Sequence, residues 1–329
     1  MSRMKLGAFA TLTAGAALLA GAAFAADKSA TSIVQLPAAG GTVTQEEGSF
    51  TLNNNTGSAN FTLPLPTLPA RGQFEPQMSL TYNQFAGDTG NGLGIGWRLN
   101  TQAITINDDF GTAVPGTKPG GDFFSHLSLM GTRLIYQGNQ NGIWEYKPEY
   151  AEDFVRIRYH TAPFDVVSLD LTGGLKTDTI PAGFEVINPD GSRLIFSADQ
   201  AVAEGNFEAA KPYVTKWPLV LQLNANRDAV RYDYQRFGGR SYLTQVSFAG
   251  GQSSYQFDLI ETQSTLVSHT IGARQENARL YGKMTARFLD TVYAQWCMGY
   301  VGRDTSDTSK FVVRAHPDCL TKAQADLAP

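Results

Sequence analysis

Cysteine and histidine are scarce in this chain of 329 residues, which contains two and four of them. His126, His160, His269 and His316 are widely spaced, and neither a His-Glu-x-x-His nor a Gly-x-Ser-x-Gly motif is present. His160 lies at a polar position of an alternating segment, so we expect it to be solvated. We therefore predict no enzymatic activity, no metal site and no cofactor. A hydrolase or transferase site assembled from distant strands leaves no motif and stays open as a weaker hypothesis.

Two acidic pairs are candidates for calcium ligands. Asp108-Asp109 and Asp304 with Asp307 lack the regular spacing of oxygen ligands in known calcium loops, so we expect them to be solvated.

Clusters of basic residues are also absent. The chain has 26 Lys and Arg against 30 Asp and Glu, a net charge of −4. A mildly acidic chain without a basic patch offers no electrostatic surface for nucleic acid or for an anionic membrane. Beyond the N-terminal region, no apolar run is long enough to cross a bilayer.

The one long apolar run lies at the N-terminus. Arg3 and Lys5 precede an Ala- and Leu-rich segment, 6–22, and Ala23-Phe24-Ala25 supplies small residues at a cleavage site. This order is typical of a secretory signal peptide, residues 1–25. Cleavage removes two basic residues and no acidic one, which changes the net charge from −4 to −6. We expect a secreted product, extracellular or periplasmic, without an integral membrane segment.

Alternation of apolar and polar residues dominates the rest of the chain. It predicts antiparallel strands with one wet face. Asn188-Pro189-Asp190-Gly191 and Gly250-Gly251 supply turn chemistry between two pairs of strands. We expect a mainly β fold of antiparallel strands and hairpins, shell-like or sandwich-like, with very little helix. The alternating segments are 61–65, 78–82, 155–159, 167–171, 184–196, 230–234 and 246–259, with Leu80, Tyr82, Val155, Ile157, Val230 and Tyr232 facing inward.

Some boundaries are less sharply marked. Segment 275–290 fits helical and strand spacing, and we expect a helical turn or loop that leads into a strand. Segment 108–121 is rich in Gly and is either a long loop or a seam between subdomains. The expected organisation is a signal peptide (1–25), a flexible leader (26–41), one β domain (42–320) and an unstructured tail or truncated end (321–329).

The two cysteines, Cys297 and Cys319, lie near the C-terminus. A single pair in an exported chain favours one structural disulfide, which closes a loop and contributes about 3 kcal/mol. A zinc site with His316 as a further ligand and a redox pair remain as weaker alternatives.

A glycine-rich turn is the most distinctive local motif. Gly92, Gly94 and Gly96 allow positive φ and close backbone approach, and Trp97 follows as a large apolar side chain. A phosphate-binding loop is the rival interpretation. It is disfavoured because no Gly-Lys-Ser/Thr follows and because no helix pattern begins after Gly96.

Aromatic residues are abundant, 36 in total. Exposed aromatic rings stack on sugars, so a carbohydrate- or cell-surface-binding module is an alternative function. We expect Trp97, Trp144, Trp217 and Trp296 to fill the core or its rim instead, with Trp217 at the start of a strand over 219–223.

The block 57–105 carries a resemblance to a known family. A paired-proline strand (57–66), a P-x-x-x-L-x-Y strand (76–83) and a G-x-G-x-G-W turn (91–100) follow one another in order. This block resembles the opening of the N-terminal domain shared by the SpvB and insecticidal toxin-complex B-subunit proteins, which are associated with RHS repeats. Weaker similarity extends over about 40–320, including 224–248, which is similar to a degenerate RHS unit.

The resemblance implies a secreted, non-enzymatic shell or assembly domain that acts in toxin packaging or delivery. Its partner would be an RHS-type toxin or another shell subunit. The ADP-ribosyltransferase that SpvB carries at its far end has no counterpart in these residues, so that activity is not expected here. In related chains a Cys pair falls where Cys297 and Cys319 lie.

Overall fold

The computed structural model describes residues 48–53, 58–87, 91–106, 127–150, 155–208, 212–262, 267–269, 274–303 and 311–319. Strands make up 61% of the structure and helix 4%, and the strand pairings are antiparallel, which confirms the predicted mainly β fold. The expected signal peptide, leader and C-terminal tail lie outside the described residues, as does most of the glycine-rich segment 108–121. In the described part, none of the helices has the length and apolar character that a transmembrane span requires.

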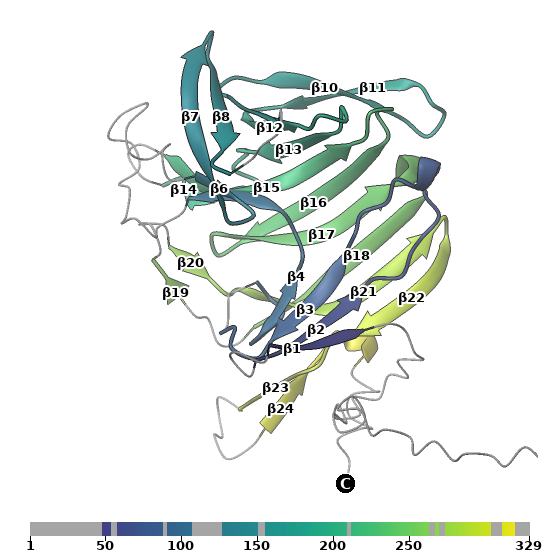
Figure 1. Ribbon diagram of the computed structural model, residues 1–329. Coiled ribbons are helices and arrows are strands. Elements are labelled where there is room, and N and C mark those ends of the chain that lie inside the picture. Colours follow the sequence, from purple (N-terminus) through teal and green to yellow (C-terminus); the bar gives the residue numbers. More distant parts are fainter. Residues whose placement is uncertain are drawn as a thin grey trace, which may run out of the picture. The chain divides into compact units, whose positions relative to one another are not determined.

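Eight strands close into a ring, which the sequence did not predict (Figure 1). Pairing of the last strand with the first completes the ring, and β14 (Glu204–Asn206) adds to β15. In order, the ring consists of β13 (Arg193–Ser197), β12 (Gly183–Ile187), β9 (Arg156–His160), β8 (Ile143–Pro148), β7 (Thr132–Gln140), β6 (Leu127–Leu129), β5 (Ala103–Ile106) and β15 (Tyr213–Leu223).

Aromatic side chains from non-adjacent strands meet inside the ring. Phe184 of β12 lies 5.2 Å from Trp217 of β15 and 5.8 Å from Tyr146 of β8, centroid to centroid. Phe184 and Trp217 are almost fully buried. Because large rings in edge-to-face contact fill the space between the strands, the ring is a packed core.

Five further strands extend the ring from β15. They are β16 (Ala229–Phe237), β17 (Arg240–Phe248), β18 (Ser253–Glu261), β21 (Arg279–Phe288) and β22 (Thr291–Cys297), in that order. Val230, Val246, Tyr255 and Met284 are buried on one face, whereas Asp233, on the same strand as Val230, is exposed. This is the two-faced pattern expected of half-wetted antiparallel strands.

A four-stranded N-terminal sheet covers the apolar face of this extension. It consists of β1 (Ser49–Asn53), β2 (Ser58–Pro64), β3 (Ser79–Asn83) and β4 (Trp97–Leu99). Leu80 of β3 belongs to the same apolar cluster as Val230 and Met284. The Tyr255 hydroxyl donates to the Pro66 carbonyl oxygen at 2.7 Å, which fixes the connection between β2 and β3 on β18.

The hairpin of β10 (Phe164–Leu169) and β11 (Leu175–Ile180) covers a second apolar cluster. Val166 packs there with Ile195, Leu221 and Leu223. The alternating segment 167–171 puts the apolar residues 167, 169 and 171 on one face, whereas the buried face of β10 is shifted from it by one residue. Val166 and Ser168 are the buried positions, whereas Leu171 lies in the following turn and is half exposed.

Most other alternations are confirmed. Leu80, Ile157, Val230 and Tyr232 are buried, and Tyr82 and Val155 are partly buried. Segment 275–290 forms β20 (Gln275–Glu276) and then β21, so the expected strand is present and the helical turn is not. β15 begins at Tyr213 and passes through Pro218, so Trp217 lies within the strand and not at its start.

Two short strand pairs and two 3-10 turns remain. β20 pairs with β19 (Val267–Ser268), and β23 (Tyr300–Arg303) pairs with β24 (Phe311–Arg314). Short 3-10 turns lie at Arg71–Gln73 and Ala249–Gly251, the second in the Gly250-Gly251 turn that the sequence predicted.

Candidate functional site

The glycine-rich turn joins the N-terminal sheet to β21. Gly92, Gly94 and Gly96 all have positive φ, between 81° and 85°. The Gly92 carbonyl oxygen accepts the Tyr281 backbone N–H at 2.8 Å and the Tyr300 hydroxyl at 3.1 Å. A Cβ atom on Gly92 would lie 3.1 Å from the Tyr242 ring, so the backbone needs glycine for close approach as well as for conformation.

Gly96 and the side chain of Asn91 fix the C-terminal end of this turn. A Cβ atom on Gly96 would lie 2.9 Å from the Asn83 carbonyl oxygen, and the Gly96 carbonyl oxygen accepts the Asn83 N–H. The Asn91 side chain bridges the turn, since it donates to the Trp97 carbonyl oxygen at 2.7 Å and accepts from the Leu93 N–H. The carbonyl oxygens of this turn already accept hydrogen bonds from other residues of the protein. We therefore interpret the turn as a structural connection within the fold.

Trp97 is partly buried at the end of the turn. Its ring lies 5.3 Å from Tyr82 and 6.3 Å from Phe61, and it packs against the main apolar cluster. Trp144 and Trp217 are buried, and Trp296 is partly buried against the same cluster. The indoles of Trp144 and Trp217 are therefore not open to stacking on a sugar.

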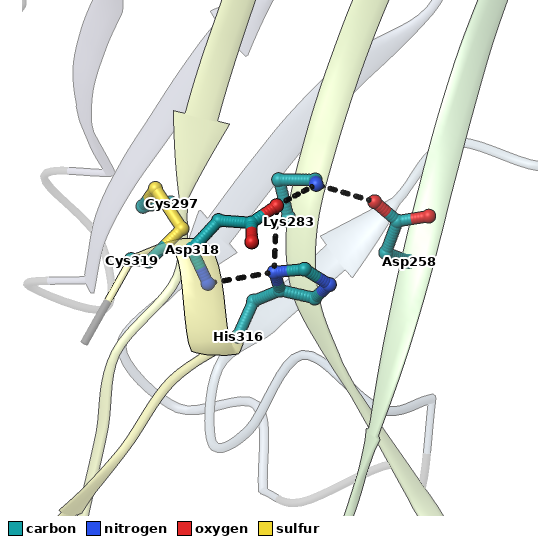
Figure 2. The surroundings of a disulfide bond; sticks show 6 residues. All are labelled: Asp258, Lys283, Cys297, His316, Asp318 and Cys319. Atoms are coloured by element: carbon teal, nitrogen blue, oxygen red, sulfur yellow. Dashed lines mark hydrogen bonds and ion pairs between the residues drawn. A yellow bond between two sulfur atoms is a disulfide. The ribbon is translucent and has the colours of Figure 1, made fainter.

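The second site that the sequence singled out is a disulfide corner at the end of β22 (Figure 2). Cys297 and Cys319 are joined by a disulfide, so neither sulfur is available to a zinc ion or to a redox cycle between free thiols. The bond ties residue 319 to the last strand of the large sheet. It is a local crosslink.

A polar cluster flanks this disulfide. Lys283 of β21 reaches Asp318 at 2.7 Å and Asp258 of β18 at 3.1 Å, and His316 Nδ1 lies 3.5 Å from Asp318 (Figure 2). The hydrogen bond to Asp318 raises the pKa of Lys283, and the reciprocal bond lowers the pKa of Asp318. Because Asp318 is exposed, solvent screens the pair, and its contribution to stability is small.

The large sheet ends at β22, and among the described residues only β21 pairs with this strand. Leu289 in the preceding turn and Val292 and Tyr293 of β22 are exposed. Ala294 and Trp296 instead pack against the main apolar cluster. The strand thus has one paired side and one side that is free in the described structure, with apolar side chains next to it, which is the arrangement that accepts another strand.

Two buried carboxylates were not predicted from the sequence. Glu185 of β12 accepts from Arg193 Nε at 2.7 Å and lies 3.1 Å from His160 Nε2. Burial raises the pKa of Glu185, but His160 and Arg193 outweigh it and hold that pKa below its usual value. His160 is mostly buried, with 14% of its side chain exposed, and stacks on Phe164, so its expected solvation is wrong.

The second carboxylate is Glu204 of β14. It accepts from Lys216 Nζ at 2.7 Å, from the Ser241 N–H at 3.2 Å and from Gln275 Nε2 at 2.8 Å. These partners come from β15, β17 and β20. No sequence motif marks either carboxylate, because every partner reaches it from another strand.

Of the remaining candidates, two lie in the described residues. His269 is exposed and His316 lies in the disulfide corner. His126, Asp108, Asp109, Asp304 and Asp307 lie outside the described residues. Over the described ranges, no three His, Cys, Asp or Glu residues gather closely enough to hold a metal ion.

Comparison with known proteins identifies the relatives of this chain. A family model described as the Salmonella virulence plasmid 65kDa B protein, SpvB, matches residues 53–247. No curated protein matches the chain.

Several solved structures share the fold. The N-terminal domain of the effector protein SpvB from Salmonella typhimurium strain LT2 is 13% identical with a TM-score of 0.56, over 78% of this chain and 98% of that one. The TcdB2-TccC3 structure is 15% identical with a TM-score of 0.58, over 81% of this chain and 16% of that one. The Photorhabdus luminescens Tc holotoxin pore is 15% identical with a TM-score of 0.57, over 82% and 16%. This chain therefore spans about a sixth of the Tc chains it matches.

Proposed function

Because the chain belongs to the family of the Salmonella virulence plasmid 65kDa B protein, SpvB, we propose that it is an exported, non-enzymatic assembly domain of a toxin complex. The shared fold with TcdB2-TccC3 and with the Tc holotoxin pore supports a structural role within a multi-subunit assembly. The proposed partner is an RHS-type toxin or another shell subunit.

The open edge of β22 is the observation that carries this proposal. A strand with an unpaired side and adjacent exposed apolar groups is prone to pair with another chain, and monomeric proteins usually protect such edges with charge or proline. The stretch from Thr291 to Cys297 contains neither a charged residue nor a proline. A strand from the partner would continue the sheet and cover Val292 and Tyr293.

The proposed lack of catalysis is supported by the contacts of the two buried carboxylates. Glu185 is engaged by Arg193 and His160, and Glu204 by Lys216 and two further donors. Carboxylates held in this way stabilise the structure and are poorly placed to exchange protons with a substrate. The buried tryptophans likewise give no support to a sugar-binding function through Trp144 or Trp217.

Export is proposed on the N-terminal sequence. Residues 1–25 have the charge, apolar run and small residues of a signal peptide. The intramolecular disulfide between Cys297 and Cys319 suits an oxidising compartment.

Co-sedimentation of the protein lacking residues 1–25 with a purified RHS-repeat toxin subunit tests the assembly role. Tyr293→Lys places a charge beside the open edge, and we expect it to reduce the co-sedimenting fraction at least tenfold. Leu175→Lys on β11 is the matched control, since Leu175 is 68% exposed and Tyr293 is 64% exposed. Equal co-sedimentation of both variants would contradict assembly through β22, and no co-sedimentation of the unaltered protein would contradict the partner.

A further inference from the structure

A polar cavity of about 850 Å³ lies at the ends of β14, β16 and β20. It is separate from the glycine-rich turn, the disulfide corner and β22. Several turns that are distant in sequence line it, among them 200–201, 205–208 and 238–239, together with His269 and Arg274. Its volume is in the range of sites for small molecules.

Arg236 is the central charged group of this cavity. Its guanidinium carbon lies 4.5 Å from the centroid of the Phe207 ring, and its Nη1 donates to the Gln200 carbonyl oxygen at 3.3 Å. Its Nε is enclosed without a hydrogen-bond acceptor. Burial lowers the pKa of Arg236 although the charges of Glu204 and Glu208 raise it. The side chain is thus held in place without a direct carboxylate contact.

The neighbouring cations are paired, in contrast to Arg236. Arg274 forms an ion pair with Glu276, and Lys216 forms one with Glu204. Within the described ranges, no Asp or Glu lies within ion-pair distance of Arg236. The enclosed Nε cannot reach a ligand, but the terminal Nη atoms of Arg236 make one hydrogen bond among the described residues, from Nη1 to Gln200. Two adjacent guanidinium donors match the two oxygens of a carboxylate.

We propose that this cavity binds a carboxylated sugar, such as a uronic or sialic acid, with Arg236 holding the carboxylate. The lining is mostly polar and includes Gln200, Glu208, Arg274 and the two glycines Gly238 and Gly239. A lone small anion would leave most of the cavity empty, and an apolar ligand would leave these polar groups without partners. This ligand goes beyond the assembly role and does not depend on it.

Isothermal titration of the protein lacking residues 1–25 with glucuronic acid and with N-acetylneuraminic acid tests the proposal. We expect saturable binding of at least one of them, and at least a tenfold loss of affinity for its methyl ester, which lacks the negative charge. Arg236→Gln should lose affinity to the same extent. Arg156→Gln, at an exposed position of β9, should bind like the unaltered protein. Circular dichroism of both variants checks that the fold is retained.

Three results would overturn the proposal. The first is the absence of saturable binding of either acid by the unaltered protein. The second is equal affinity of the acid and its methyl ester, or of Arg236→Gln and the unaltered protein. The third is equal affinity for acetate or inorganic phosphate, which would show an anion site without recognition of the sugar. None of these outcomes bears on pairing at β22, so failure here is distinguishable from failure of the assembly role.

Discussion

The carbonyl oxygen of Gly92 accepts the backbone N–H of Tyr281 at 2.8 Å, and this bond joins the N-terminal sheet to the extension of the ring. The two residues are far apart in sequence. The bond requires the Gly92 backbone to lie against the Tyr242 ring and the Arg279 carbonyl oxygen. The turn is therefore a packing contact between two sheets as well as a chain reversal.

Replacement of Gly92 by alanine tests this contact. The positive φ alone costs about 1 kcal/mol, and the close approach adds to it, so we expect a loss of about 2–3 kcal/mol in the free energy of unfolding. Gly131→Ala is the control, because Gly131 has a similar φ of 84° and no atom within 4 Å of the position that a methyl group would take. Urea unfolding measures both, and equal losses would contradict the contact.

Removal of the disulfide tests the corner at β22. The bond joins residues 22 apart in sequence, and its loss should reduce the free energy of unfolding by about 3 kcal/mol in the chain-entropy description. Urea unfolding of the Cys297→Ser, Cys319→Ser double variant should match that of the reduced unaltered protein. An unchanged midpoint in both would show that the crosslink does not constrain the unfolded chain.

The buried carboxylate of Glu185 predicts a dependence of stability on pH. Burial raises its pKa, but His160 and Arg193 lower it further, so the folded pKa lies below the ordinary glutamate value of 4.5. The stabilisation is therefore complete above about pH 4.5 and is lost as the pH falls through the lower folded pKa. Glu185→Gln should destabilise the protein at pH 7 by about 3 kcal/mol, since it leaves the Arg193 guanidinium without its carboxylate in a mostly buried cluster.

The same variant should differ much less from the unaltered protein in strong acid, where Glu185 is protonated. Glu145→Gln is the control, because Glu145 is more than half exposed and its ion pair with Arg158 is long. Thermal unfolding at pH 7 and near pH 2 measures the difference. A deficit for Glu185→Gln that is the same at both values would contradict a lowered pKa for this carboxyl group.

Cleavage after Ala25 is expected on export. Mass spectrometry of the protein recovered from the periplasm or medium should find an N-terminus at Ala26, with 304 residues of the original 329. Ala25→Asp disrupts the small-residue cleavage site and should leave the unprocessed form. An exported protein that retains Met1 would contradict the signal-peptide assignment.

The two-faced strands were predictable because their alternation is encoded locally. Phe184 and Val186 lead to a Pro-Asp-Gly turn, and they pair with Phe196 and Leu194 as the sequence indicated. The glycine-rich turn was also predictable from the sequence, since three alternating glycines before a tryptophan indicate a backbone with positive φ and close packing. Both signals lie within a short stretch of chain.

Closure of the ring was not predictable in this way. β13 pairs with β15 between residues 193–196 and 219–223, and no local pattern specifies that pairing. Pro218 concealed the true start of β15, because proline is rare within central strands. It is tolerated where the pairing of β15 shifts from β5 to β16.

The face of β10 was misassigned because Val166 and Val167 are both apolar. The buried position two residues on is Ser168, whose hydroxyl receives a hydrogen bond from Arg231 at 2.8 Å. A buried serine looks like an exposed one in sequence. The clusters at Glu185 and Arg236 were also not predicted, because the residues that contact these side chains come from other parts of the chain and leave no local sequence pattern.

Hydrogen–deuterium exchange of the β22 amides, with and without a purified RHS-repeat toxin subunit, tests assembly through this strand most directly. We expect the amides of Thr291–Cys297 to become strongly protected in the complex, whereas those of Leu175–Ile180 on β11 exchange as before. A stable complex in which β22 exchanges at its free rate would contradict assembly through this edge.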